Sequence, residues 1–273
     1  MEKENSKNPY IKLYTAIILL LVYIAVVSLP FPIWTNEIVG KVIDITLKVG
    51  YIIFAYLTIY RYELCKIKYG PDKNWKLLLL IPLIALTFSN WIFVWIFKSP
   101  LNTSINAVSL SLSISTTVVT VFSEELLFRE IIHETLRQYI KKDYLIILIS
   151  AGIFASMHFL NIFSGLNPLN VLAQVGYTFV LGLVLGLLKE KKAGLVALVI
   201  FHLLFNLLNN DLFSVLYQGD WTVQFVVTNV IVGAVVVLYG VGMYFALYNN
   251  SLSSSMKNDE DDKISDTTEE ENN

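Results

Sequence analysis

The chain has 273 residues, of which 55% are hydrophobic, and its formal net charge is −2. A mean hydropathy of +0.61 excludes an ordinary water-soluble domain, because such a domain must cover its surface with polar side chains. The single cysteine, Cys65, excludes an intrachain disulfide and a cysteine-rich metal site, and it is assigned no role.

The apolar residues fall in blocks of about 17 to 25, the length that an α-helix needs to cross a bilayer. The blocks do not alternate between polar and apolar residues, as the strands of a membrane β-barrel do. The sequence therefore predicts an all-α fold, a polytopic membrane bundle of about eight transmembrane helices. In chain order, the predicted spans are residues 12–33, 41–60, 77–97, 105–128, 144–163, 169–188, 193–209 and 223–248.

Three regions follow from this pattern. Residues 1–11 form a short amino-terminal segment, and residues 12–248 form the eight-span membrane domain. The first span lacks a small-residue cleavage site and is expected to be retained. Residues 249–273 carry eight Asp or Glu and almost nothing apolar, which predicts a disordered acidic tail.

Basic residues are concentrated in every second connection. Seventeen of the 20 Lys and Arg lie in the amino-terminal segment, in residues 61–76, 129–142 and 189–192, and in the tail, whereas the other connections contain only Lys98. By the positive-inside rule, both termini and the basic connections are expected on the cytoplasmic side.

Lys41 and Lys48 are basic residues inside the second span, and they form one helical stripe with Glu37 and Asp44. Such a stripe can line a wet cavity or mark the submerged start of a helix. The sequence leaves both alternatives open.

Residues 129–142, which follow span four, have apolar positions on one side and charges on the other. This pattern predicts an amphipathic helix at the cytoplasmic interface, partly submerged unless span four continues past Arg129. His133 lies in this segment, but HETLR lacks the second histidine of an HExxH zinc motif, and His133 is assigned no role. Gly182 and Gly186, on span six, suit close packing of two helices.

Three ionisable residues end span four: Glu124, Glu125 and Arg129. A charged side chain deep in a span costs roughly 2.5 to 3.5 kcal/mol unless it has a partner. Glu125 and Arg129 are four residues apart with the acid first, the better orientation for a helical ion pair. Glu124 is then unmatched and needs polar company elsewhere in the bundle.

Further polar residues lie in two other apolar spans. His158 is in span five, His202 is in span seven, and Asn206 follows His202 on the same helical face. Each histidine alone is more often a hydrogen-bonded packing residue than a functional one. Together with the unmatched Glu124, these residues on three spans predict a polar site inside the bundle.

The motifs EELLFR (124–129), FASMH (154–158) and HLLFN (202–206), in this order and each on its own span, resemble the pattern of the CPBP family. This family comprises membrane-embedded CAAX proteases and bacteriocin-processing enzymes and is also called the abortive-infection family. The resemblance covers residues 105–210 by motif and most of 12–248 by architecture. One departure is Glu130, which follows the motif arginine where many members have glycine.

The resemblance implies hydrolysis of a peptide bond inside the membrane. It assigns the activation of water to Glu124 and His158, and the stabilisation of the oxyanion to His202 and Asn206. Glu125 and Arg129 would support them. A divalent metal stays open as a cofactor, because Glu124, His158 and His202 are ligand types of a catalytic zinc site, whereas Asn206 suits an oxyanion donor better.

The expected partners are a peptide or membrane-protein substrate and the lipid bilayer, with no nucleic acid. The bias toward Ile, Lys and Asn suggests an AT-rich bacterium, so a multi-pass protein of a bacterial plasma membrane is expected, with a role in bacteriocin or peptide processing or in self-immunity. The alternative is a non-catalytic membrane adaptor of the same fold that binds a sensor kinase or a bacteriocin target. A small transporter is disfavoured because no duplicated halves are evident. The sequence leaves the oligomeric state open.

Overall fold

The computed structural model describes residues 9–28, 37–70, 88–98 and 107–212, together with residues 216 and 217 and isolated positions between 230 and 242. The predicted third span falls mostly outside this part of the chain, and only its end is described, as helix α4 (Ser89–Phe97). The predicted eighth span, apart from those isolated positions, and the acidic tail also lie outside the described residues.

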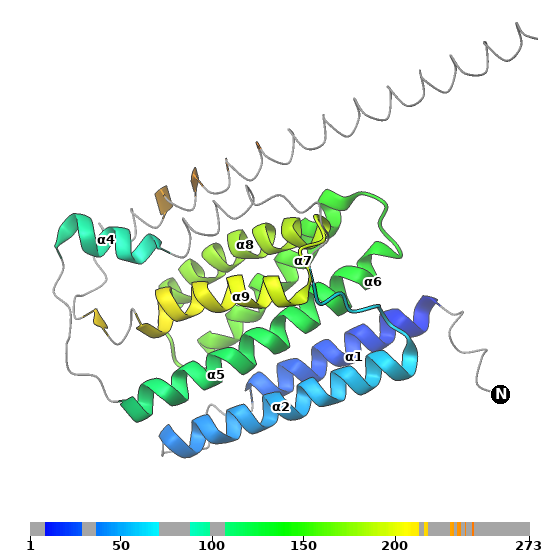
Figure 1. Cartoon of the computed structure of the whole chain (residues 1–273), viewed down its shortest axis with the longest axis horizontal. Helices are drawn as coiled ribbons and strands as arrows, with labels where there is room; N and C mark the ends of the chain where they lie inside the picture. Colours follow the sequence, from blue (N-terminus) through cyan, green and yellow to red (C-terminus); the bar gives the residue numbers. More distant parts are fainter. Residues whose placement is uncertain are drawn as a thin grey trace, which may run out of the picture.

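The described elements are all helical, as predicted, and they run side by side as a bundle (Figure 1). Helices α1 and α2 form one flank, next to the long helix that begins with α5, and α7, α8 and α9 cover the other side of α5. The helices are α1 (Pro9–Ser28), α2 (Glu37–Tyr62), α5 (Ala107–Glu125), α6 (His133–Arg137), α7 (Asp143–Ser156), α8 (Pro168–Glu190) and α9 (Leu195–Asn206). A π-helical segment, Leu126–Ile132, joins α5 to α6 without a break.

Within the residues that the structure describes, five helical stretches are long and apolar enough to cross a membrane, which makes this a multi-pass membrane protein. They correspond to predicted spans one, two, four, five and six, and the shorter apolar helix Leu195–Asn209 corresponds to span seven. The stretches are Tyr10–Ser28, Ile38–Tyr62, Leu110–Arg137, Asp143–Ile162 and Pro168–Glu190. The total of eight spans and the cytoplasmic position of the termini stay predictions.

Of the two alternatives predicted for the segment after span four, the structure supports the continuation of span four past Arg129, and not an interfacial helix over residues 129–137. Span four continues as one stretch of 28 residues from Leu110 to Arg137. Arg129, Glu130 and His133 have 0% exposure, so this part presents no polar face to solvent. The charges that looked amphipathic instead find partners on neighbouring helices, as described below. The continuation past Arg129 places Glu124 roughly 20 Å from the end of the stretch, deep enough to meet the motifs of the other spans.

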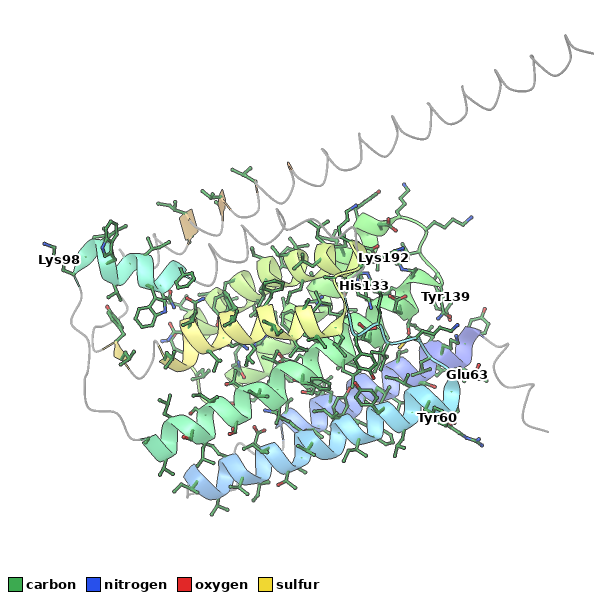
Figure 2. The ribbon with its side chains drawn as sticks, viewed as in Figure 1. Tyr60, Glu63, Lys98, His133, Tyr139 and Lys192 are labelled. Atoms are coloured by element: carbon green, nitrogen blue, oxygen red, sulfur yellow. The ribbon has the colours of Figure 1, made fainter. Side chains whose placement is uncertain are left out.

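The charged ends of the bundle follow the predicted alternation. Figure 2 shows Glu63, His133, Tyr139 and Lys192 at one end and Lys98 at the opposite end. The basic connections that follow α2, α6 and α8 therefore lie together at one end of the bundle.

The segment 64–70, after α2, folds back onto the start of α9. The first backbone N–H groups of a helix lack partners within the helix. Here the Leu195 amide donates to the carbonyl of Lys68 at 2.7 Å, and the Val196 amide donates to that of Tyr69 at 3.1 Å. Gly194 has φ +80°, and a Cβ there would lie 2.5 Å from the carbonyl oxygen of Gly70. Only glycine permits this close approach.

Cys65 lies in the same segment, partly buried. Burial, with a smaller effect of the Glu130 carboxylate, raises the pKa of the Cys65 thiol to about 12. The thiol is therefore protonated near neutral pH.

Helices α7 and α8 pack closely through the two predicted glycines. A Cβ added at Gly182 would lie 3.0 Å from the Cβ of Ala151, and one added at Gly186 would lie 3.1 Å from Ile147 Cγ2. This contact confirms the packing role expected for both glycines.

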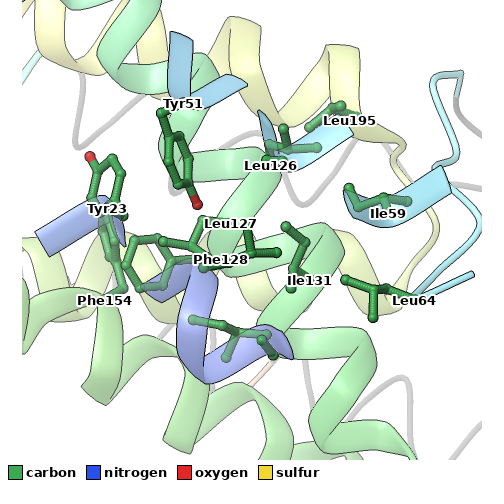
Figure 3. Close-up of a cluster of buried hydrophobic side chains, with 14 residues drawn as sticks. Tyr23, Tyr51, Ile59, Leu64, Leu126, Leu127, Phe128, Ile131, Phe154 and Leu195 are labelled. Atoms are coloured by element: carbon green, nitrogen blue, oxygen red, sulfur yellow. The ribbon is translucent and has the colours of Figure 1, made fainter. Parts of the chain in front are cut away.

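The main apolar cluster surrounds the π-helical segment, where α1, α2 and α7 meet it (Figure 3). Its aromatic members include Tyr23, Tyr51, Phe128 and Phe154, each with at most 2% exposure. This cluster forms one wall of the polar site.

Candidate active site

Each motif lies where its helix departs from regular α-helical geometry. Helix α5 becomes π-helical directly after Glu125, and α9 becomes π-helical, over Leu207–Asp211, directly after Asn206. Helix α7 passes into a 3₁₀ segment, Met157–Ile162, which contains His158. Single π-helical turns occur frequently at functional sites. The three departures from α-helical geometry thus coincide with the three sequence motifs.

Glu125 connects the first motif to the third. Its carboxylate accepts a hydrogen bond from Arg129 Nε at 3.3 Å, which confirms the predicted ion pair. Its other oxygen lies 2.8 Å from Nδ1 of His202, and all three side chains are buried. A carboxylate can only accept, so Nδ1 of His202 carries the hydrogen and Nε2 points into the site. Glu125 therefore orients His202, a role that spacing along one helix could not indicate.

Glu124 lies on the open side of this pair with 8% exposure. The Tyr23 hydroxyl, on α1, donates to its Oε1 at 3.1 Å. Its Oε2 lies 3.7 Å from Nε2 of His202, and the positive charge of Lys48 on α2 also acts on it. The polar partners that the sequence predicted for Glu124 thus come from three neighbouring helices.

Asn206 completes the network. Its amide nitrogen lies 3.3 Å from Nε2 of His202. With the hydrogen of the neutral ring on Nδ1, Nε2 accepts a hydrogen bond from this amide. Motifs one and three, 77 positions apart between Glu125 and His202, are therefore in direct contact.

The phenylalanine of the second motif lies between both histidines. The rings of His158 and His202 meet the Phe154 ring nearly perpendicularly, with centroids 5.5 and 5.7 Å away. The Arg129 guanidinium stacks on the same ring, 5.2 Å from its centroid. Phe154 therefore packs against residues of all three motifs.

His158 joins the site through this packing. Its Nε2 is buried and makes no hydrogen bond to any residue that the structure describes. A buried ring nitrogen needs a partner, and water or a substrate group can provide one.

The fit of a metal can be tested on these donors. Among the described residues, no three carboxylate, imidazole or thiol groups are arranged to hold a metal ion. Nδ1 of His202 is bonded to Glu125, which would suit a metal ligand as well, but its Nε2 lies beside the amide nitrogen of Asn206, which is not a metal ligand. In this arrangement the three predicted donors do not fit a zinc site.

The stripe on α2 faces α5. Lys41 donates to Ser113 at 3.0 Å, and Lys48 pairs with Asp44 at 2.7 Å and donates to Thr120 at 2.8 Å. Lys48 has 7% exposure, so its charge lies inside the bundle, and its partner Thr120 precedes Glu124 by about one helical turn. The side chain of Glu37 lies outside the described residues.

A second ionic network, toward the basic end of the bundle, was not predicted. His133 Nε2 lies 2.7 Å from Glu190 on α8, which also pairs with Arg137. Glu130 is fully buried, and its Oε2 lies 2.7 Å from Nζ of Lys189. Glu130, the departure from the family pattern, thus has a cation on α8, and His133 has a structural role. Partners 57 positions away leave no signal in local spacing.

Replacing Lys189 with methionine is expected to destabilise the protein by about 3 to 5 kcal/mol, because the buried Glu130 carboxylate loses its cation. Adding Glu130→Gln should recover most of this loss, because no buried charge then remains. Lys191→Met at the same helix end is the matched control and should change stability little. Unfolding in mixed micelles measures all four proteins, and equal stability of Lys189→Met and Lys191→Met would contradict the role given to the pair.

Comparison with known families covers this same part of the chain. Residues 106–208 match the family model described as Rce1-like, type II CAAX prenyl endopeptidase. The match contains all three motifs and runs from the start of α5 into the π-helical segment after α9. It confirms the resemblance seen in the sequence. No curated protein matches the chain.

Proposed function

We propose that this membrane protein, whose residues 106–208 match the model of the Rce1-like family of type II CAAX prenyl endopeptidases, is an intramembrane endopeptidase. It would hydrolyse a peptide bond of a peptide or of a membrane-associated protein. The observation that carries the proposal is the contact between motifs. Glu124, His202 and Asn206, from two separate helices, adjoin one another inside the bundle.

Glu124 is proposed to activate the water. Its Oε1 is held by Tyr23, which leaves Oε2 to accept a proton from a water molecule as that water attacks the scissile carbonyl. The same carboxyl group then delivers this proton to the leaving amine. His158 is proposed to hold the attacking water through Nε2, which supports the proposal because this buried nitrogen makes no hydrogen bond within the described residues.

Asn206 and His202 are proposed to stabilise the negative charge that develops on the carbonyl oxygen. The side-chain amide of Asn206 is proposed to donate an N–H to this oxygen. His202 is proposed to donate a second N–H from Nε2 after it has taken up a proton from bulk water. Donors fixed in a site of low dielectric stabilise such a charge far better than water does. Glu125, held by Arg129, supports this step because it fixes the ring of His202.

The mechanism is proposed to be metal-independent. The arrangement of His202 between Glu125 and the Asn206 amide supports this choice over a zinc site. The substrate is proposed to be a leader or signalling peptide, such as that of a bacteriocin, in a bacterial plasma membrane. The prenylated CAAX sequence in the family's description is the other substrate class to test.

The membrane peptides of cells that express wild type, Glu124→Ala or His158→Ala test the function. Both variants are expected to accumulate uncut peptides that wild-type cells contain in cleaved form, at unchanged abundance of the protein. Mass spectrometry then identifies the substrate and the cut bond. Cleavage that continues in both variants would contradict the protease proposal. It would favour the non-catalytic adaptor, which predicts identical peptides in all three strains.

A further inference from the structure

Tyr23 is a polar residue of the site that lies outside the three motifs and outside the segment that matches the family. It is on α1, 101 positions before Glu124, and it has 2% exposure. Its hydroxyl donates to Oε1 of Glu124 at 3.1 Å, while Oε2 of the same carboxylate faces His202. The two oxygens of Glu124 are therefore distinguished by the residue that each one faces.

Packing holds the Tyr23 ring in place. The Tyr51 ring on α2 lies 5.2 Å from it, and the Phe128 ring lies 6.3 Å from it, edge to face. Phe128 belongs to the π-helical segment that follows Glu125. The orientation of the hydroxyl is thus fixed by two helices besides its own.

We propose that Tyr23 is a positioning residue for Glu124 and that helix α1 is therefore part of the catalytic machinery. The effect of Tyr23 on catalysis rests on the proposed function, whereas the hydrogen bond between Tyr23 and Glu124 can be tested separately. The terminal torsion of a glutamate has a broad, roughly two-fold preference, so a free carboxylate rotates readily. A hydrogen bond to one oxygen restricts this rotation and keeps the other oxygen toward the reacting water.

Tyr51 provides a matched control. It is equally buried and adjoins Tyr23, but its hydroxyl makes no hydrogen bond to any described residue. Figure 3 shows the hydroxyl groups of Tyr23 and Tyr51 pointing in opposite directions. Replacement of either tyrosine with phenylalanine removes one oxygen atom and keeps the ring.

In kinetics on a quenched, farnesylated CAAX peptide, Tyr23→Phe is expected to lower kcat about tenfold with KM unchanged, the effect of losing one hydrogen bond to a charged group. Tyr51→Phe should leave both constants unchanged. Unchanged kcat in Tyr23→Phe, beside an inactive Glu124→Gln, would overturn the positioning role and leave the proposed function intact. An active Glu124→Gln would instead overturn the proposed function.

Infrared spectroscopy tests the hydrogen bond without any substrate. The difference between the spectra of wild type and Glu124→Gln isolates the carboxyl bands of Glu124. These bands are expected to shift in Tyr23→Phe and to stay in place in Tyr51→Phe. Bands at the wild-type frequencies in Tyr23→Phe would overturn the proposal whatever the activity.

Discussion

Replacing Glu124 with glutamine is expected to lower the rate of peptide cleavage by about 10² to 10⁴-fold, the usual contribution of a general base. Glutamine has the same shape and can still accept the hydrogen bond from Tyr23, but it cannot take a proton from water. The measurement is the turnover of a quenched peptide by purified protein in detergent, with a farnesylated CAAX peptide and an unprenylated leader peptide as probes.

Glu134→Gln is the matched control for this change. Glu134 is in the same membrane stretch, but its side chain is 30% exposed and pairs with Lys189 and Arg137 at the bundle end. This variant should retain wild-type turnover.

Exhaustive chelation should leave the wild type fully active. Loss of activity on chelation, with recovery on addition of zinc, would contradict the metal-independent mechanism and not the peptidase itself.

Replacing Glu125 with alanine is expected to destabilise the protein by about 3 to 5 kcal/mol, because it leaves the fully buried Arg129 without its carboxylate. It should also abolish cleavage, because Nδ1 of His202 loses the group that orients it. The unfolding midpoint in mixed micelles and peptide turnover measure the two effects.

A second substitution separates these effects. Arg129→Met in the Glu125→Ala background removes the unpaired charge and should recover most of the lost stability. Cleavage should stay absent, because His202 still lacks its partner. If the double variant is no more stable than Glu125→Ala, the ion pair between Glu125 and Arg129 does not determine stability. If the double variant cleaves peptide, Glu125 is not needed to orient the ring of His202.

The sequence could single out polar residues that the structure brings together, because burial in a membrane makes them conspicuous. Glu124, His158 and His202 stand out in apolar spans, and the four-residue spacing of Glu125 and Arg129 indicates their contact. The helical periodicity that places Asn206 beside His202 also holds in the structure. Such predictions depend only on local geometry and on the cost of an unpaired polar group in a membrane.

The partners from distant segments could not be predicted. Nothing in the sequence around Tyr23 distinguishes it from the other tyrosines of the chain, since its role depends on how α1 packs against α5. The same applies to Lys189, which looks like a basic residue at a helix end and instead neutralises a buried glutamate.

The sequence could not decide between an interfacial helix and a continued span four, for a related reason. An amphipathic pattern indicates two different environments on two faces, but it does not say whether the polar face meets water or other charged side chains. In this protein, the buried face of Glu130 and His133 meets Lys189 and Glu190.

The contact between segment 64–70 and α9 has a consequence for the depth of the reaction. Leu195 and Val196 are hydrogen-bonded to Lys68 and Tyr69, so the loop after α2 determines where along the bundle axis α9 begins. His202 lies seven residues into α9, roughly 10 Å from that point. The depth of the His202 imidazole in the bundle is therefore set partly by a connection that carries no motif. Each residue by which α9 slid against this loop would move the imidazole by about 1.5 Å.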